Sequence, residues 1–227
     1  MRKLIYVPVV HTSADLGSMA AEASRRGIAS LGEETWEVHR KTVDGFWDTI
    51  SNYFDSVDVA GMKVYQDGMV ADEEVGAKLV EEGAKSGSKN YELVARLLKS
   101  GAILVKTEEL RLVKQEVDTL LAIVQAKRIS KKVIAFIRYK LGKNRLLRKR
   151  DEFIARRIDE TLDEGETGII FIGAFHNIKG KLPEDVQVME VKHTEEVREY
   201  QKLLPSCQKN RERFEELGRY LVSDVLE

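Results

Sequence analysis

The sequence predicts a layered α/β fold, with helices on both faces of a mainly parallel or mixed central sheet. Apolar runs of strand length alternate with longer segments that have helical periodicity. The first run, residues 4–10, is apolar throughout, as expected of a strand buried on both faces. The segments between successive runs are long enough to cross over a sheet, which favours parallel pairing.

The first half of the chain contains two expected strands and four expected helices. The strands span residues 4–10 and 57–65, and the helices span residues 15–26, 33–54, 72–85 and 90–99. Small, Ala-rich residues indicate the first helix, and Gly27 is interpreted as its stop signal. Large apolar side chains recur at helical spacing in the second helix: Trp36, Val43, Phe46, Trp47 and Ile50. Glycine-containing turns separate the remaining elements.

The second half opens with a short strand at 102–105 and continues with helical periodicity over 109–162. We expect a break in this helical region near Gly142, and Gly165 ends it. Strands at 168–173 and 186–191 follow, and a helical tail spans 195–227. We therefore expect one α/β domain over 1–227, with 109–162 as a helical insertion or cap.

Composition excludes several classes of protein and site. Lys and Arg total 37 against 38 Asp and Glu, so net charge indicates neither nucleic-acid nor membrane binding. Cys207 is the only cysteine, which excludes an intrachain disulfide and a cysteine-based zinc site. No apolar run approaches the length of a membrane span, so we expect a cytoplasmic protein without a membrane partner.

Titratable side chains follow the expected strands at their carboxyl ends, where α/β proteins collect functional groups. His11, Asp67 and His176 follow the first, second and fourth strands. Two imidazoles and a carboxylate are a common ligand set for a divalent metal such as Mn, Co or Zn. The structural alternative is that each histidine is an ordinary loop residue and that Asp67 forms a turn with Gly68.

Three further side chains complete the hypothesis of a catalytic site. Glu108 would transfer a proton, and Lys106 would stabilise developing negative charge. Arg150 would bind a substrate carboxylate or pair with Asp151 or Glu108. The alternative for Glu108 is a residue at a helix start, where the helix dipole favours acidic side chains.

The C-terminal half contains a recognisable order of motifs. Arg150-Asp151 opens a helix, a hydrophobic strand follows at 168–173, and Gly173-Ala174-Phe175-His176 ends it, with Gly180 soon after. This order resembles the TraB/PrgY family, which is related to the Tiki proteases and more distantly to the erythromycin-esterase and ChaN-like proteins. The resemblance implies a metal-dependent peptidase that uses two Gly-x-x-His motifs and an acidic residue. Because Pro8 replaces the first glycine and the family's Glu-Leu-Asp pattern is missing, we expect a divergent soluble member.

Three functions follow as hypotheses. The first is a metal-dependent hydrolase that cleaves a peptide or ester bond in a peptide or small-molecule substrate. The second is a catalytically inactive relative that binds or sequesters such a molecule, which the departures at Pro8 and Asp67 favour. The third is binding of nucleic acid or an acidic partner through the basic helical region 127–157, whose alternative is a solvated helix face. We expect no nucleic-acid partner under the first two hypotheses, and a homo-oligomer is compatible with all three.

Overall fold

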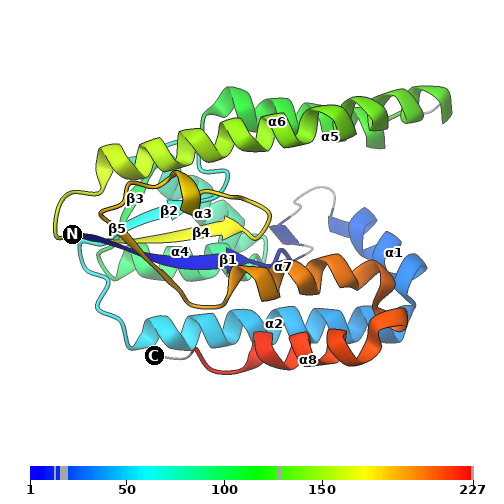
Figure 1. Ribbon diagram of the computed structural model, residues 1–227, viewed down its shortest axis with the longest axis horizontal. Helices are drawn as coiled ribbons and strands as arrows, with labels where there is room; N and C mark the ends of the chain where they lie inside the picture. The colour runs from blue at the N-terminus through cyan, green and yellow to red at the C-terminus, as the bar shows by residue number, and fades with distance from the viewer. Residues whose placement is uncertain (13, 16–19, 127–128, 226–227) are drawn as a thin grey trace.

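The structure is a computed structural model that describes residues 1–12, 14–15, 20–126 and 129–225. Its centre is a five-stranded sheet with the order β3-β2-β4-β1-β5 (Figure 1). The strands are β1 (Arg2–Val9), β2 (Lys63–Gln66), β3 (Ile103–Val105), β4 (Thr167–Gly173) and β5 (Val186–Glu190). Every pairing between these described strands is parallel, which confirms the predicted α/β class and makes the sheet parallel rather than mixed.

Helices cover both faces of the sheet. They are α1 (Ala20–Leu31), α2 (Glu33–Asp55), α3 (Glu73–Lys85), α4 (Lys89–Lys99), α5 (Leu110–Val124), α6 (Ile129–Thr161), α7 (Thr194–Leu203) and α8 (Arg211–Val222). Short 3-10 helices lie at Lys179–Lys181 and Leu204–Asn210. In the described part of the chain, no helix combines the length and apolar character needed to cross a bilayer.

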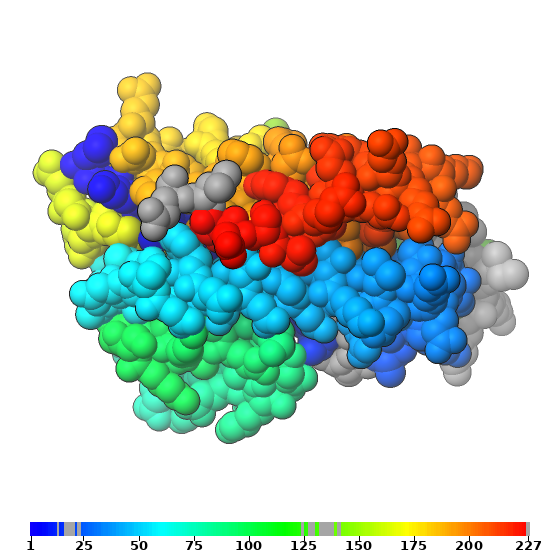
Figure 2. Space-filling view, turned by 90° about the horizontal axis from the view of Figure 1, so that it is seen from below, coloured from blue at the N-terminus to red at the C-terminus, as the bar shows by residue number. Residues whose placement is uncertain are grey.

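Alternating residues of each strand supply two separate cores, because successive strand side chains point to opposite faces. Ile5, Val7 and Val9 pack in the core that α2, α4, α7 and α8 cover. On that side, α2 packs against α8, as Figure 2 shows from below, and α8 in turn packs against α7. Leu4 and Tyr6 face the opposite core, which the second half of α6 closes.

The helical region 109–162 forms two antiparallel helices above the sheet (Figure 1). The second half of α6 packs on the sheet through Ile154 and Ile158, and Leu162, directly after the helix, continues the four-residue spacing; all three are buried. The first half of α6 packs against α5, and the pair extends beyond the sheet. We call α5 and residues 129–149 of α6 the arm.

The expected break near Gly142 is wrong. Helix α6 runs unbroken through Gly142, and the change of direction falls between Val124 and Ile129 instead. A single glycine inside a helix costs only about 1 kcal/mol, which the rest of a long helix absorbs. The expected stop at Gly27 is wrong as well, because α1 continues to Leu31. A Cβ on Gly27 would lie 2.4 Å from Cζ3 of Trp36, so this glycine allows close packing of α1 on α2.

One expected boundary also changes. The strand expected at 57–65 is confined to Lys63–Gln66, because the preceding segment turns at Gly61, whose φ of 77° suits glycine. The helical tail expected over 195–227 consists, in its described part, of α7, a 3-10 segment and α8. Pro205 lies at the start of that 3-10 segment, where proline ends the regular hydrogen bonding of the preceding helix.

Candidate metal centre

The three residues predicted as metal ligands converge at the carboxyl edge of the sheet. Asp67, His176 and His11 follow β2, β4 and β1, which are neighbours in the strand order. They surround Gly173, the last residue of β4. A Cβ at Gly173 would lie 3.3 Å from Asp67 Oδ2, 3.6 Å from His176 Cδ2 and 3.8 Å from His11 Nε2. The parallel topology therefore brings two imidazoles and one carboxylate to one place.

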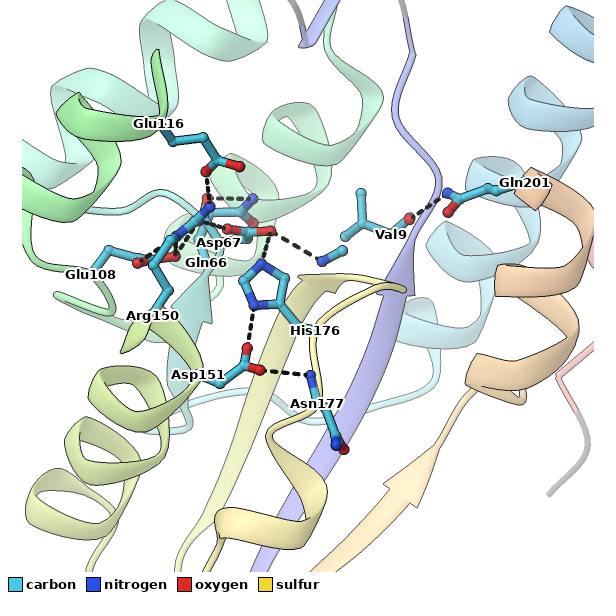
Figure 3. A network of polar contacts seen from close by, with 11 residues as sticks. Val9, Gln66, Asp67, Glu108, Glu116, Arg150, Asp151, His176, Asn177 and Gln201 are labelled. Carbon is cyan, nitrogen blue, oxygen red and sulfur yellow. Dashed lines mark hydrogen bonds and ion pairs between the residues drawn. The ribbon is translucent and has the colours of Figure 1, made fainter. Parts of the chain in front are cut away.

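His176 lies between two carboxylates (Figure 3). Its Nδ1 is 2.6 Å from Asp151 Oδ1, and its Nε2 is 3.4 Å from Asp67 Oδ2. The second oxygen of Asp151 accepts a hydrogen bond from the backbone N–H of Asn177 at 3.1 Å, which fixes the carboxylate against the loop after β4. Burial alone would lower the pKa of His176, but the charge of Asp67 and the hydrogen bonds to both carboxylates raise the pKa to about 10.

His11 has a similar arrangement on the other side of Gly173. Its Nδ1 is 3.6 Å from Asp15 Oδ2, and 52% of its side chain is exposed. The backbone N–H of Thr12 donates to Asp15 Oδ2 at 2.6 Å, and the hydroxyl of Ser88 donates to Asp15 Oδ1. Burial opposes a charged His11, but Asp15 and Asp67 outweigh it and raise the pKa of His11. Each imidazole thus directs Nδ1 toward its own carboxylate and leaves Nε2 on the side of Asp67.

Asp67 divides its two oxygens between the protein and the site. Oδ1 accepts a hydrogen bond from Arg150 Nη2 at 2.6 Å. Oδ2 accepts one from the backbone N–H of Gly173 at 3.1 Å and lies on the His176 side. Burial would raise the pKa of Asp67, but His176 and Arg150 overcome that effect and hold the pKa well below its usual value. Asp67 is therefore an anionic carboxylate with one oxygen facing the imidazoles.

Arg150 connects three carboxylates. Its Nε lies 3.0 Å from both oxygens of Glu108, and its two Nη atoms reach Asp67, Glu108 and Glu116 (Figure 3). Glu108 is fully buried at the start of the segment after β3. Burial raises the pKa of the Glu108 carboxyl, and the Arg150 guanidinium opposes that shift. Of the two partners expected for Arg150, a substrate carboxylate or a neighbouring acid, the structure pairs it with acids of the protein.

A cleft of about 830 Å³ opens over this edge. Its walls come from β1, β2, β4, α4, α5, α6 and α7 and include His11, Asp15, Gln66, Asp67, Asn90, Tyr91, Glu116, Tyr139, Lys143, Arg150, Phe175, His176 and Gln201. Glu108 and Lys106 are not among the described residues that line it. Lys106 makes its hydrogen bonds here through its backbone. Its N–H donates to the Asp72 carboxylate, and its carbonyl accepts a hydrogen bond from Arg157 Nε at 3.1 Å.

One group of the described side chains could hold a metal ion: ligand atoms of Asp67, Glu108 and His176 lie within 4.8 Å of one another, and His11 is not part of this group. Arg150 already holds both oxygens of Glu108. His11 lines the cleft and supplies a neutral nitrogen once deprotonated, so we favour it over Glu108 as the third ligand. In metal sites, a ligating histidine commonly directs its second nitrogen to a carboxylate, which fixes the ring. His11 and His176 both have such a carboxylate.

The sequence did not indicate the side chains that orient these ligands. Asp15 lies four residues after His11 in a segment expected to be an ordinary helix start, and its partner Ser88 is 73 positions away. Asp151 stood out only as part of the Arg150-Asp151 motif, and nothing marked Glu116. Of the basic region 127–157, Lys127 and Arg128 lie outside the described residues.

Comparisons with known proteins add no relative: no family model matches the chain, and no curated protein or solved structure is significantly similar to it. The TraB/PrgY resemblance therefore depends on the motifs in the sequence.

Proposed function

We propose that this protein is a metal-dependent hydrolase that cleaves a peptide or ester bond in the cleft above β1, β2 and β4. One observation supports this most: two imidazoles, each backed by its own carboxylate, face the same aspartate at the carboxyl edge of a parallel sheet. The TraB/PrgY-like motifs Arg150-Asp151 and Gly173-x-x-His176 include residues of this arrangement.

His11, Asp67 and His176 would hold the ion, with Mn, Co or Zn as the expected metals. When bound, a divalent ion supplies Lewis acidity to a substrate carbonyl and to water. Asp15 and Asp151 contact the two rings, and Arg150 binds the second oxygen of Asp67. In this proposal the three side chains would hold the ion from the protein side, and the cleft would admit the substrate.

Glu116 is better placed than Glu108 for proton transfer. Glu116 lines the cleft, 33% of its side chain is exposed, and Arg150 contacts only its Oε2. Glu108 is fully buried and held through both oxygens, so its carboxylate anchors Arg150. Lys106 is not among the described residues that line the cleft, so the charge-stabilising role that the sequence suggested for it has no support there.

The direct test is metal binding together with hydrolysis. Dialysed protein should bind Mn²⁺, Co²⁺ or Zn²⁺ in calorimetry and, when loaded, release product from a mixture of quenched-fluorescence peptides or from an aryl ester. His11→Ala and His176→Ala should each weaken metal binding by about 100-fold or more, since each removes one ligand. His193→Ala is the matched control, because His193 is exposed and stacks on Tyr220 away from the cleft. Wild-type protein that binds none of the three ions at millimolar concentration would refute the proposal.

A catalytically inactive binding protein is the second candidate, and the Asp67–His176–Asp151 chain favours it. An imidazolium between two carboxylates is electrostatically complete, so the fold can use it as an ion-paired core. This candidate predicts ligand binding in the cleft without metal uptake or turnover, and the same calorimetry and hydrolysis measurements separate the two.

The basic helical region gives less support to the third hypothesis. Arg150 and Arg157 point into the structure, where they bind acids and the carbonyl of Lys106. Both Arg148 and Arg156 are exposed, and each lies near a glutamate one helical turn later. The Nε–Oε1 distance is 3.7 Å for Arg148 with Glu152 and 3.7 Å for Arg156 with Glu160. Much of the region's charge is therefore structural or balanced by neighbouring acids.

A further inference from the structure

The arm contains a second cavity beside the cleft. It has a volume of about 930 Å³ and lies between α5 and α6. Glu116, Tyr139 and Lys143 line both this cavity and the cleft. The two spaces therefore adjoin, and we call the cavity between the helices the arm groove.

The two spaces together are longer than one small ligand requires. Pockets for single small molecules are about 300–1,000 Å³, and the cleft already has a volume of that order. A molecule that occupies both spaces is elongated: one part reaches the edge where His11 and His176 lie, and another follows the arm.

The walls of the arm groove carry an excess of positive charge over an apolar floor. Its charged lining residues are Arg111, Lys114, Lys131, Lys143, Glu116 and Asp118, and Ala122, Ala126 and Leu146 contribute apolar surface. Lys114 is 3.4 Å from Asp118, but both side chains are exposed, so this pair is weak. Within the described part of the chain, neither Lys131 nor Lys143 pairs with a carboxylate; Lys143 lies over the Tyr139 ring, 6.0 Å from its centroid. These two ammonium groups can receive carboxylates of a ligand.

The mixed lining favours an acidic peptide over a nucleic acid. Glu116 and Asp118 would repel a continuous row of phosphates, whereas a peptide can place isolated acidic side chains beside the lysines.

We propose that the arm groove binds an extended, acidic polypeptide segment and leads it toward the metal centre. The proposal rests on the proposed function only for what happens at the cleft end, because binding in the groove needs neither metal nor turnover. It assigns Lys131 and Lys143 to carboxylates of the ligand and the apolar floor to its aliphatic side chains.

Gly142 allows a sharp steric test. It lines the arm groove, and a Cβ built on it meets no atom within 4 Å. Gly142→Trp should therefore fill the groove without displacing the protein, and Gly142→Ala is the control that leaves it open. Binding of a fluorescein-labelled 12-residue peptide rich in Asp, Glu and Leu is measured by anisotropy, with chelator present to prevent cleavage. Gly142→Trp should weaken binding by about tenfold or more, which is at least about 1.4 kcal/mol, and Gly142→Ala by less than about twofold.

Charge reversal gives an independent test. The double variant Lys131→Glu, Lys143→Glu should weaken binding of the acidic peptide by about tenfold or more. The control is the double variant Arg145→Glu, Lys149→Glu, which makes an equal charge change at exposed sites of α6 that do not line the groove. It should have only a small effect on binding. Equal binding of a peptide with Lys in place of each acid, or unchanged binding by Gly142→Trp, overturns the proposal. Single-stranded DNA that displaces the peptide and binds more tightly, with a steeper salt dependence, overturns it in favour of nucleic acid. Groove binding that persists in a protein without metal uptake supports this proposal and refutes only the hydrolase.

Discussion

Replacing Arg150 with Met should strongly destabilise the protein, because it leaves Glu108 charged and buried without a partner. Glu108 is fully buried, and both of its oxygens lie 3.0 Å from Arg150 Nε. Removing one member of a buried ion pair typically costs about 3–5 kcal/mol in the free energy of unfolding, since the remaining charge keeps its desolvation penalty. The loss of contacts to Asp67 and Glu116 acts in the same direction. We therefore expect a decrease of about 4 kcal/mol for Arg150→Met.

Urea unfolding followed by circular dichroism measures this directly, with the slope m checked for constancy. Arg40→Met is the control, because Arg40 pairs with Glu37 at 2.7 Å on the surface and should contribute less than about 1 kcal/mol. Adding Glu108→Gln to Arg150→Met should restore part of the loss, which gives a coupling free energy of about 2 kcal/mol in the double-mutant cycle. If Arg150→Met costs no more than Arg40→Met, or if the two site substitutions simply add, Arg150 is not the partner that makes the buried carboxylate tolerable.

Three further predictions follow from single residues. Burial lowers the pKa of His39 to about 4, while the pKa of an unfolded histidine is about 6.5. The unfolded state therefore takes up a proton first as the pH falls, and the free energy of unfolding should decrease by up to about 3 kcal/mol between about pH 6.5 and pH 4. His39→Phe should reduce this pH dependence in thermal melts at several pH values. A melt of His39→Phe with the wild-type pH slope would contradict this. Gly142→Ala should raise the free energy of unfolding by about 0.5–1 kcal/mol in urea titrations, because alanine favours the helix and meets no atom there; a decrease would mean that the position is crowded. Gly173→Ala would place a methyl group 3.3 Å from Asp67 Oδ2. It should weaken metal binding in calorimetry by about tenfold or more, with only a small change in melting temperature. Unchanged metal affinity would mean that the ion binds elsewhere.

The fold was predictable because its elements differ clearly in periodicity and length. The continuous apolar runs gave the buried strands, and the crossover lengths gave parallel pairing. Boundaries were harder wherever a glycine served packing. Gly27 and Gly142 have the same local signature as helix ends, and only the tertiary neighbours show that one receives Trp36 and the other lies in a groove.

The site was predictable to the extent that strand ends determine it. His11, Asp67 and His176 could be grouped because parallel strands end at one edge, although their adjacency depends on the strand order β2-β4-β1, which the sequence does not show. The orienting partners depend on long-range packing. Arg150 reaches acids 34, 42 and 83 positions away, and no spacing rule connects residues so far apart.

This edge of the sheet holds a second imidazole–carboxylate pair beside the ion pairs of Asp67, and the proposed metal centre would give that pair a role. Asp67 is already neutralised by Arg150 and His176, so an ion-paired core would be complete without His11. His11 nevertheless lies beside Gly173 with its own carboxylate, Asp15, whose side chain is only 6% exposed. Hydrogen bonds from the Thr12 N–H and the Ser88 hydroxyl, together with His11, outweigh the cost of burying Asp15 and lower the pKa of its carboxyl. A divalent ion held by both Nε2 atoms and Asp67 would place positive charge among all three carboxylates, and Asp15 would then fix a ligand in the way that Asp151 fixes the other.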